Sequence, residues 1–171
     1  MNAGAYGGEM KDVLRSVRYL NGALELCESE DLQLSYRHSR FSDSEDIILS
    51  AEMELQKGEE SAIREGMKNL MERRKASQPL DLPSAGSTFK RPVGGYAAAL
   101  IDEAGLRGYA VGGAQVSEKH AGFVVNRGGA TCEDVRRLMA HIQETVFARS
   151  GIMLEPEVKL IDEKGGMGWN S

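Results

Sequence analysis

The chain has 171 residues, of which 41% are hydrophobic, and it carries a formal net charge of -5 at neutral pH. This length and composition predict a folded protein with a buried core, organised as one domain or two small ones. The acidic balance argues against a general nucleic-acid binder, because contacts to phosphate backbones need a basic surface.

Cysteine usage and hydropathy indicate the compartment. Cys27 and Cys132 lie far apart and belong to no CxxC pair, so neither a disulfide framework nor a zinc site is predicted. No segment has the apolar length of a membrane span, and the first residues lack the basic-then-apolar order of a signal peptide. We therefore expect a cytoplasmic protein with no membrane partner and no bound metal.

The first part of the chain has the alternating pattern of β-strands. Strands are predicted over Val13–Leu20, Ala23–Leu26 and Asp46–Leu55. Asn21-Gly22 lies between the first two and is typical of a tight hairpin turn, because both residues tolerate a positive φ. The pattern indicates a small antiparallel sheet.

A polar and aromatic segment, Leu34–Phe41, lies between the second and third predicted strands. Arg37 follows an aromatic residue there, and a guanidinium can bind a carboxylate through two hydrogen bonds. The alternative is a surface connection in which a cation rests on Tyr36 or Phe41.

A helix is predicted over Glu59–Ala76, where apolar residues recur at helical spacing, acids come early and bases come late. It links the first part of the chain to a second part in which helices and strands alternate. The elements predicted in the second part are a helix over Tyr96–Ala104, strands over Tyr109–Val111, Ala114–Val116 and Phe123–Val125, a helix from a Thr131 cap to Arg149, and a strand over Val158–Ile161.

The expected fold class is therefore α+β, in four segments. Residues 1–56 form the sheet-rich first part, residues 57–79 the linking helix, residues 80–164 a small α/β domain and residues 165–171 a glycine-rich tail.

Two polar positions in the second part are candidates for chemistry. Ser87 follows Gly86, and Pro92 stops a helix from including the segment, so the hydroxyl is expected on a rigid turn. An ordinary solvated turn is the alternative. Glu157 follows Pro156 at the start of the predicted last strand, either as a catalytic acid or as an edge charge.

Other catalytic patterns have weaker support. His38 and His120 have no nucleophile motif beside them, and such histidines are more often structural. No Ser-His-Asp order, metal-spaced cluster, Walker loop or GxGxxG can be assembled from the sequence, so hydrolysis and ATP-driven chemistry have low priority.

Five stretches of the sequence have the form of motifs. They are a glycine motif at Met1–Met10, YRxSxF at Tyr36–Phe41, GSxFKxP at Gly86–Pro92, the stretch Gly112–Phe123, and EPEV within Leu154–Val158. In this order they resemble the motifs of one family, the UDP-N-acetylenolpyruvoylglucosamine reductases of bacterial peptidoglycan synthesis. The motifs cover nearly the whole chain, which makes the set more specific than any single member.

The resemblance implies the family's reaction, in which NADPH reduces bound FAD and a hydride passes to the β-carbon of an enolpyruvyl ether on a UDP-sugar. It implies that Ser87 protonates the α-carbon and that Arg37 and Glu157 are the other catalytic residues. A cation and a carboxyl group suit the negative charge that develops as the hydride adds. The implied binding residues are Asn2, Ala3, Gly4, Ala5 and Gly7 for FAD, and Lys90, Arg91, Arg107 and His120 for the substrate.

Family members carry a first flavin subdomain, with a phosphate-cradling loop, ahead of the glycine motif with which this chain begins. We therefore expect residues 1–56 to be the trailing part of a flavin domain, residues 80–164 to be the substrate-binding domain, and FAD binding to be weak or absent. The sheet is also expected to have an exposed edge, and hence to form a homodimer through residues 1–55. The alternatives are a nucleotide-sugar-binding module without redox chemistry and a degenerate fold without a ligand.

Overall fold

A computed structural model of the chain describes residues 1–161. The fold is α+β, as the sequence predicts, with three α-helices and several antiparallel sheets within these residues. The chain divides into two compact units, Met1–Leu70 and Met71–Ser171, so the division falls inside the linking helix. Each unit is described by itself below.

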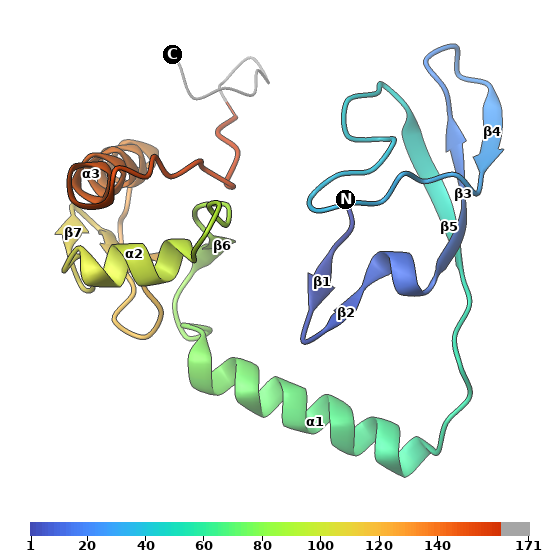
Figure 1. Ribbon diagram of the computed structural model, residues 1–171, viewed down its shortest axis with the longest axis horizontal. Helices are drawn as coiled ribbons and strands as arrows, with labels where there is room; N and C mark the ends of the chain where they lie inside the picture. The colour runs from blue at the N-terminus through green and yellow to red at the C-terminus, as the bar shows by residue number, and fades with distance from the viewer. Residues whose placement is uncertain (162–171) are drawn as a thin grey trace. The chain divides into compact units, whose positions relative to one another are not determined.

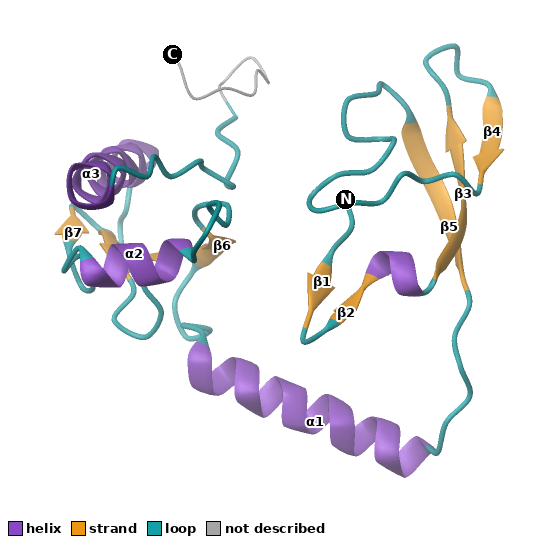
Figure 2. Cartoon of the chain, viewed as in Figure 1, coloured by secondary structure: helices purple, strands orange, loops and turns teal. Residues whose placement is uncertain are grey.

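The first unit is built on a three-stranded antiparallel sheet in which β3 (Leu14–Leu20) lies between β4 (Leu26–Ser29) and β5 (Ile47–Met53) (Figure 1). A separate hairpin precedes this sheet, formed by β1 (Gly4–Ala5) and β2 (Gly8–Glu9), and the 3-10 helix Met10–Asp12 follows it. The predicted antiparallel sheet is thus confirmed, and strands and loops dominate the unit up to α1 (Figure 2).

The predicted two-residue turn at Asn21-Gly22 is wrong. Leu20 pairs with Leu26, so the loop extends from Asn21 to Glu25 and the second strand begins at Leu26, not at Ala23. The Asn21 carboxamide oxygen accepts hydrogen bonds from the N–H groups of Ala23 and Glu25, and Leu24 adopts the positive φ of 60°. An asparagine side chain that bonds the nearby backbone stabilises this longer loop.

The core of the first unit is small. Its buried apolar residues are Val17, Tyr19 and Leu32. The guanidinium of Arg40 lies over the rings of Tyr19 and Phe41 and donates to Ser29 Oγ at 2.7 Å. The segment containing Phe41 is therefore held by a cation resting on aromatic rings, as one sequence-based alternative proposed, and this cation is Arg40.

Both β5 and the linking helix α1 (Glu60–Ser77) carry exposed apolar residues. Every residue of β5 is exposed, and no residue of α1 is buried. The exposed large apolar side chains of these elements are Ile47, Ile48, Leu49 and Met53 in β5, and Ile63, Met67, Leu70 and Met71 in α1. The helix itself forms where its spacing and charge order predict it.

The second unit is organised around a four-stranded antiparallel sheet of order β6-β9-β8-β7. Its strands are β6 (Ser84–Ser87), β7 (Ala110–Val111), β8 (Ala114–Val116) and β9 (Phe123–Asn126), and its helices are α2 (Ala97–Glu103) and α3 (Cys132–Ser150). Helix α3 contacts β7, β8 and α2. The largest fully buried side chains are Ile101, Val116, Val125, Leu138, Met139, Ile142, Val146 and Leu154.

Local signals define both ends of α3. The Thr131 hydroxyl accepts a hydrogen bond from Asp134 N at 3.1 Å, and the Asp134 carboxylate accepts one from Thr131 N at 2.9 Å. This reciprocal capping box confirms the predicted Thr131 cap. Gly151 ends the helix with a φ of 72°, a conformation that favours glycine.

The predicted last strand, Val158–Ile161, does not form. The extended pairing in this region lies earlier in the chain, where Pro156 pairs with Phe89. Val158 packs against the core of the second unit, and Val158 to Leu160 line an apolar cavity of about 420 Å³. The apolar run therefore reflects burial against neighbouring elements and not membership of a strand.

Candidate active site

Two distant motifs of the second unit meet through backbone hydrogen bonds. Glu157 N donates to Thr88 O at 2.9 Å, and Lys90 N donates to Glu155 O at 2.8 Å, on either side of the Phe89–Pro156 pair. A proline fits this central position because its neighbours supply the hydrogen bonds and no N–H is needed from it. The pairing therefore aligns the segment that contains Ser87 with the segment that contains Glu157.

Ser87 is the last residue of β6 and is exposed. The expectation of a turn is thus corrected, because Ser87 pairs with Phe123 of β9. The pairing of β6 with β9 is irregular between Ser84 and Ser87, and Gly86 within this irregularity has a φ of 89°. Glycine is suited to that conformation, so Gly86 allows the bulge that precedes the serine.

Glu157 is half-buried, directly across the hydrogen bond from the residue that follows Ser87. The structure therefore brings the two predicted catalytic residues of the second unit close together in the backbone. Arg37, the third, belongs to the first unit. It lies at the tip of a turn closed by mutual backbone hydrogen bonds of Ser35 and His38, with a φ of 57°.

The predicted substrate cations next to Ser87 have partners in the second unit. Lys90 forms an ion pair with Glu155, the residue opposite it in the pairing. Arg91 lies over the Tyr96 ring, 4.1 Å from its centroid, and its Nε donates to Gly95 O at 3.3 Å. Both cations are therefore fixed at the end of the serine segment by contacts that leave them partly or fully exposed.

Arg107 is engaged in a structural network. Its guanidinium binds both carboxylate oxygens of Asp102, at 2.8 and 2.5 Å, and donates to Glu118 O at 2.7 Å. The hydrogen bond from Arg107 holds the pKa of Asp102 below its usual value. The arrangement joins the end of α2 to the loop after β8, so a phosphate at Arg107 would compete with these bonds.

His120 also has internal contacts. Its Nδ1 accepts a hydrogen bond from Gly122 N at 3.1 Å, so a neutral imidazole carries its proton on Nε2. The ring packs edge to face on Phe123, with centroids 4.9 Å apart. Only Nε2 remains to donate to a ligand.

The residues predicted to contact FAD form the hairpin of the first unit. Tyr6 and Gly7 both have positive φ, which is the geometry of a type I′ turn. Asn2 is buried, and its carboxamide is used internally, donating to Glu9 Oε2 at 2.6 Å and accepting from Lys11 N at 3.0 Å. Glycine is needed at position 4, because a Cβ there would lie 2.9 Å from Glu9 Cγ.

The hairpin fits one part of a flavin cofactor. Ala3, Gly4, Ala5 and Gly7 are exposed, and backbone with such small side chains can lie against a flat ring. A pyrophosphate needs clustered N–H donors or cations. The groups at the end of the hairpin are instead mostly acidic. The carboxylates of Glu9 and Asp12 lie there with one cation, Lys11.

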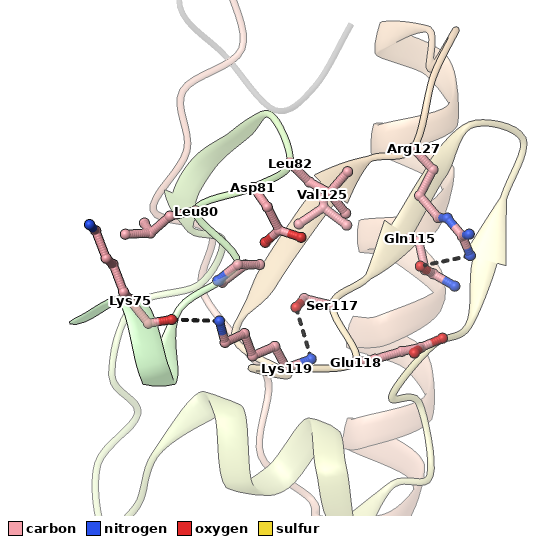
Figure 3. A pocket seen from close by; sticks show the side chains of 11 residues that line it. Lys75, Leu80, Asp81, Leu82, Gln115, Ser117, Glu118, Lys119, Val125 and Arg127 are labelled. Carbon is pink, nitrogen blue, oxygen red and sulfur yellow. Dashed lines mark hydrogen bonds between the residues drawn. The ribbon is translucent and has the colours of Figure 1, made fainter. Parts of the chain in front are cut away.

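A cavity of about 740 Å³ lies in the second unit, and no predicted site residue lines it. It is lined by Lys75, Pro79, Leu80, Asp81, Leu82, Gln115, Ser117, Glu118, Lys119, Val125 and Arg127 (Figure 3). Three cations and two acids thus surround a space large enough for a drug-sized ligand. Figure 3 shows the Asp81 carboxylate pointing into the space between Leu80 and Val125.

Hydrogen bonds fix the polar wall of this cavity. Lys119 Nζ donates to Lys75 O at 2.5 Å, which ties the loop after β8 to the end of α1. Gln115 is 8% exposed; its Nε2 donates to Gly108 O at 2.8 Å and its Oε1 accepts from Arg127 at 3.4 Å. Sequence patterns give no signal for this group, since its members are ordinary charges that only the fold brings together.

Residues 1–161 contain neither a metal-binding cluster nor a membrane-spanning helix. In that range, no three His, Cys, Asp or Glu side chains are grouped so as to hold a metal ion. The helices of the same residues include none with the length and hydropathy of a bilayer span.

The fold and these contacts define the second unit as a small α+β domain with a polar cavity and a serine aligned with a glutamate. Residues 78–161 match the family described as "UDP-N-acetylenolpyruvoylglucosamine reductase, C-terminal domain". Residues 78–161 thus match this reductase family, which agrees with the resemblance drawn from the motifs of the chain.

Relatives and a solved structure agree with the assignment. The chain is 52% identical to the UDP-N-acetylenolpyruvoylglucosamine reductase of Latilactobacillus sakei over 166 residues, covering 96% of this chain and 55% of the relative. It is 53% identical to that of Agathobacter rectalis over 165 residues, with 95% and 52% covered. The crystal structure of the Thermus caldophilus reductase is similar with a TM-score of 0.78 and 34% identity, covering 92% of this chain and 56% of that one. The chain thus spans about half the length of these relatives.

Proposed function

We propose that this chain takes part in the reduction of UDP-N-acetylglucosamine enolpyruvate to UDP-N-acetylmuramate by NADPH through FAD, in peptidoglycan synthesis. The observation that carries the proposal is the backbone pairing of Thr88 with Glu157, which aligns a serine and a glutamate from separate motifs. The names of the relatives support the same reaction.

The chemistry needs a proton donor where a carbanion develops. Ala3, Gly4, Ala5 and Gly7 would contact the ring of bound FAD, which would supply, once reduced by NADPH, a hydride for the β-carbon of the enolpyruvyl group. The electron pair of the double bond then moves toward the substrate carboxylate, and the Ser87 hydroxyl gives its proton to the α-carbon. Because Ser87 is exposed, water can return a proton to its oxygen.

Glu157 and the cations lower the barrier by stabilising charge. In this proposal the Glu157 carboxyl group lies beside the substrate carboxylate and shares a proton with the enolate that forms there. The family resemblance assigns Arg37, a residue of the first unit, to that carboxylate, and arginine binds carboxylates through two parallel hydrogen bonds. Lys90 and Arg91 add positive potential next to Ser87.

The large cavity of the second unit is the proposed site of the UDP part of the substrate. Lys75, Lys119 and Arg127 on its wall can bind phosphate oxygens, and the apolar side chains of Leu80, Leu82 and Val125 can contact a base. In this proposal the substrate spans from the cavity to Ser87 within one unit, and the proposed FAD contacts of Asn2, Ala3, Gly4, Ala5 and Gly7 come from the other.

Reconstitution tests the proposal. The purified chain is mixed with FAD, and flavin absorbance and NADPH oxidation are measured with and without the enolpyruvyl substrate. Oxidation that depends on this substrate supports the reductase function. A colourless protein that still binds the UDP-sugar would contradict it for this chain and favour the alternative, a nucleotide-sugar-binding module without redox chemistry.

Substitutions assign the roles. In an active preparation, Ser87→Ala is expected to lower substrate reduction by at least roughly 100-fold, the usual minimum for a lost acid, while flavin reduction by NADPH is unchanged. Glu155→Gln is the control, because it changes the motif that pairs with the serine segment and removes only the side-chain ion pair with Lys90. Loss of both half-reactions in Ser87→Ala would contradict its role as proton donor.

We further propose that a second copy of the chain pairs along β5. This strand is at the edge of its sheet, and all its residues are exposed. Sheet edges of this kind tend to pair with another strand, and a lysine on the edge opposes such pairing. Sedimentation is expected to show a dimer that Leu49→Lys converts to a monomer; a monomeric parent chain would disprove the pairing.

A further inference from the structure

The buried residue Thr88 binds two other segments of the second unit, namely β9 with the glycine before it and the segment that contains Glu157. It is 3% exposed. Its N–H donates to Gly122 O at 2.9 Å, its Oγ1 accepts from Val124 N at 3.0 Å, and its carbonyl oxygen accepts from Glu157 N at 2.9 Å. The backbone N–H, the hydroxyl oxygen and the carbonyl oxygen of Thr88 therefore each bind a different residue.

We propose that Thr88 is a positioning residue, which holds Ser87 and Glu157 in register for the proton transfer; the inference rests on the proposed function. Thr88 follows Ser87 directly in the chain and faces Glu157 across a backbone hydrogen bond. Its hydroxyl touches neither the substrate nor the cofactor in this proposal, so its action is through its two neighbours.

The need for such a residue follows from the bulge in β6. The pairing of β6 with β9 shifts between Ser84 and Ser87. Across the irregular part, Val124 is bound by two side chains: Ser84 Oγ donates to its carbonyl at 2.8 Å, and Thr88 Oγ1 accepts from its N–H. Hydroxyl groups thus take the place of strand backbone, and the end of β6 depends on them for its register.

Removing the Thr88 hydroxyl leaves the Val124 N–H without its partner in the interior. Buried N–H groups are rarely left unpaired, so β6 is expected to shift until this group finds water or another acceptor. Ser87 is joined to Thr88 by the peptide bond, and Glu157 by a backbone hydrogen bond. Such a shift therefore changes the distance between Ser87 and Glu157. A misplacement of about 1 Å can lower a rate by roughly 100-fold.

Thr88→Val tests the inference, because valine keeps the shape of threonine and lacks its hydroxyl. Thr88→Ser is the rescue variant, since it keeps an oxygen that can accept from Val124 N. Thr131→Val is the control: the Thr131 hydroxyl also accepts a backbone N–H, that of Asp134, but this bond caps α3 and does not involve β9. All variants are made in the full chain.

Two readouts are measured. The first is amide hydrogen exchange without any ligand, which is expected to accelerate at Val124 and Glu157 in Thr88→Val and to stay near the parent values in Thr88→Ser and Thr131→Val. The second is turnover with FAD, NADPH and the enolpyruvyl substrate. Thr88→Val is expected to lower kcat by roughly 100-fold with little change in KM, and Thr88→Ser to restore it.

Specific results overturn the inference. Unchanged exchange at Glu157 in Thr88→Val, or an equal loss of kcat in Thr131→Val, means that Thr88 contributes only general stability. If the parent chain has no turnover at all, the proposed function fails for this chain, and the exchange of Glu157 alone decides whether Thr88 sets the register.

Discussion

The two units of this chain differ in how they are stabilised. The second unit has a contiguous apolar core, with large side chains of α2, β8, β9 and α3 that are almost completely inaccessible. The first unit buries Val17, Tyr19 and Leu32, while its edge strand β5 is exposed along its whole length. Apolar burial is the main favourable term in folding, so the second unit is expected to be the more stable part.

The largest effect that tests this comparison comes from matched isoleucines. Ile142 is 1% exposed in α3, and Ile48 is 52% exposed in β5. Ile142→Ala is expected to lower the free energy of unfolding by about 2–5 kcal/mol, because it removes buried carbon atoms and leaves a cavity. Ile48→Ala is expected to cost less than about 1 kcal/mol. Urea unfolding followed by circular dichroism measures both, and equal losses would break the comparison.

Glycines of the two units give the next effect. A Cβ on Gly113, before β8, would lie 2.5 Å from Ala130 N and 2.6 Å from Gly128 O, whereas one on Gly66 of α1 meets nothing within 4 Å. Gly113→Ala is expected to destabilise the second unit by about 1–3 kcal/mol, since backbone must move. Gly66→Ala is expected to stabilise α1 by about 0.5–1 kcal/mol. Thermal unfolding compares the two changes. A shift of the unfolding temperature in the same direction for both variants would contradict the backbone contact at Gly113.

The smallest effect is a pH dependence at the start of α3. Hydrogen bonds from the backbone and side chain of Thr131 lower the pKa of Asp134. Because the native pKa is depressed, the stabilisation is fully present above the pKa of the unfolded carboxyl, about 3.9, and is lost as the pH falls through the native value. An NMR titration of the Asp134 carboxyl group measures its native pKa directly. Thr131→Val is expected to move the Asp134 titration back toward its ordinary value, and no change on substitution would contradict the cap.

Local signals in the sequence predicted the helices well. The Thr131 cap and the periodic apolar residues before Arg149 define α3, because caps and spacing act within a few residues. The loop after β3 was mispredicted, since its length depends on Asn21 side-chain bonds that residue type alone does not reveal. The apolar run at Val158 predicts a strand, because burial by packing and burial by strand pairing select the same apolar residues.

The candidate site was predictable only in part. Ser87 and Glu157 were identified through motif resemblance, but their alignment depends on backbone pairing between segments that are distant in the sequence. The cavity around Lys75, Lys119 and Arg127 was missed, because isolated charges have no periodic or spacing signal. Long-range pairing, which no local pattern encodes, assembled both features.

One measurement tests the central claim most directly, namely that the second unit is the stable part and contains the substrate site. Amide hydrogen exchange of the full chain is recorded without ligand and with UDP-N-acetylglucosamine enolpyruvate. The account predicts slowest exchange in β8, β9 and α3, fast exchange in β5, and added protection from the ligand at Ser117 and Lys119 beside the cavity. Equal protection of β5 and α3, or ligand protection that leaves the second unit unchanged, would contradict it.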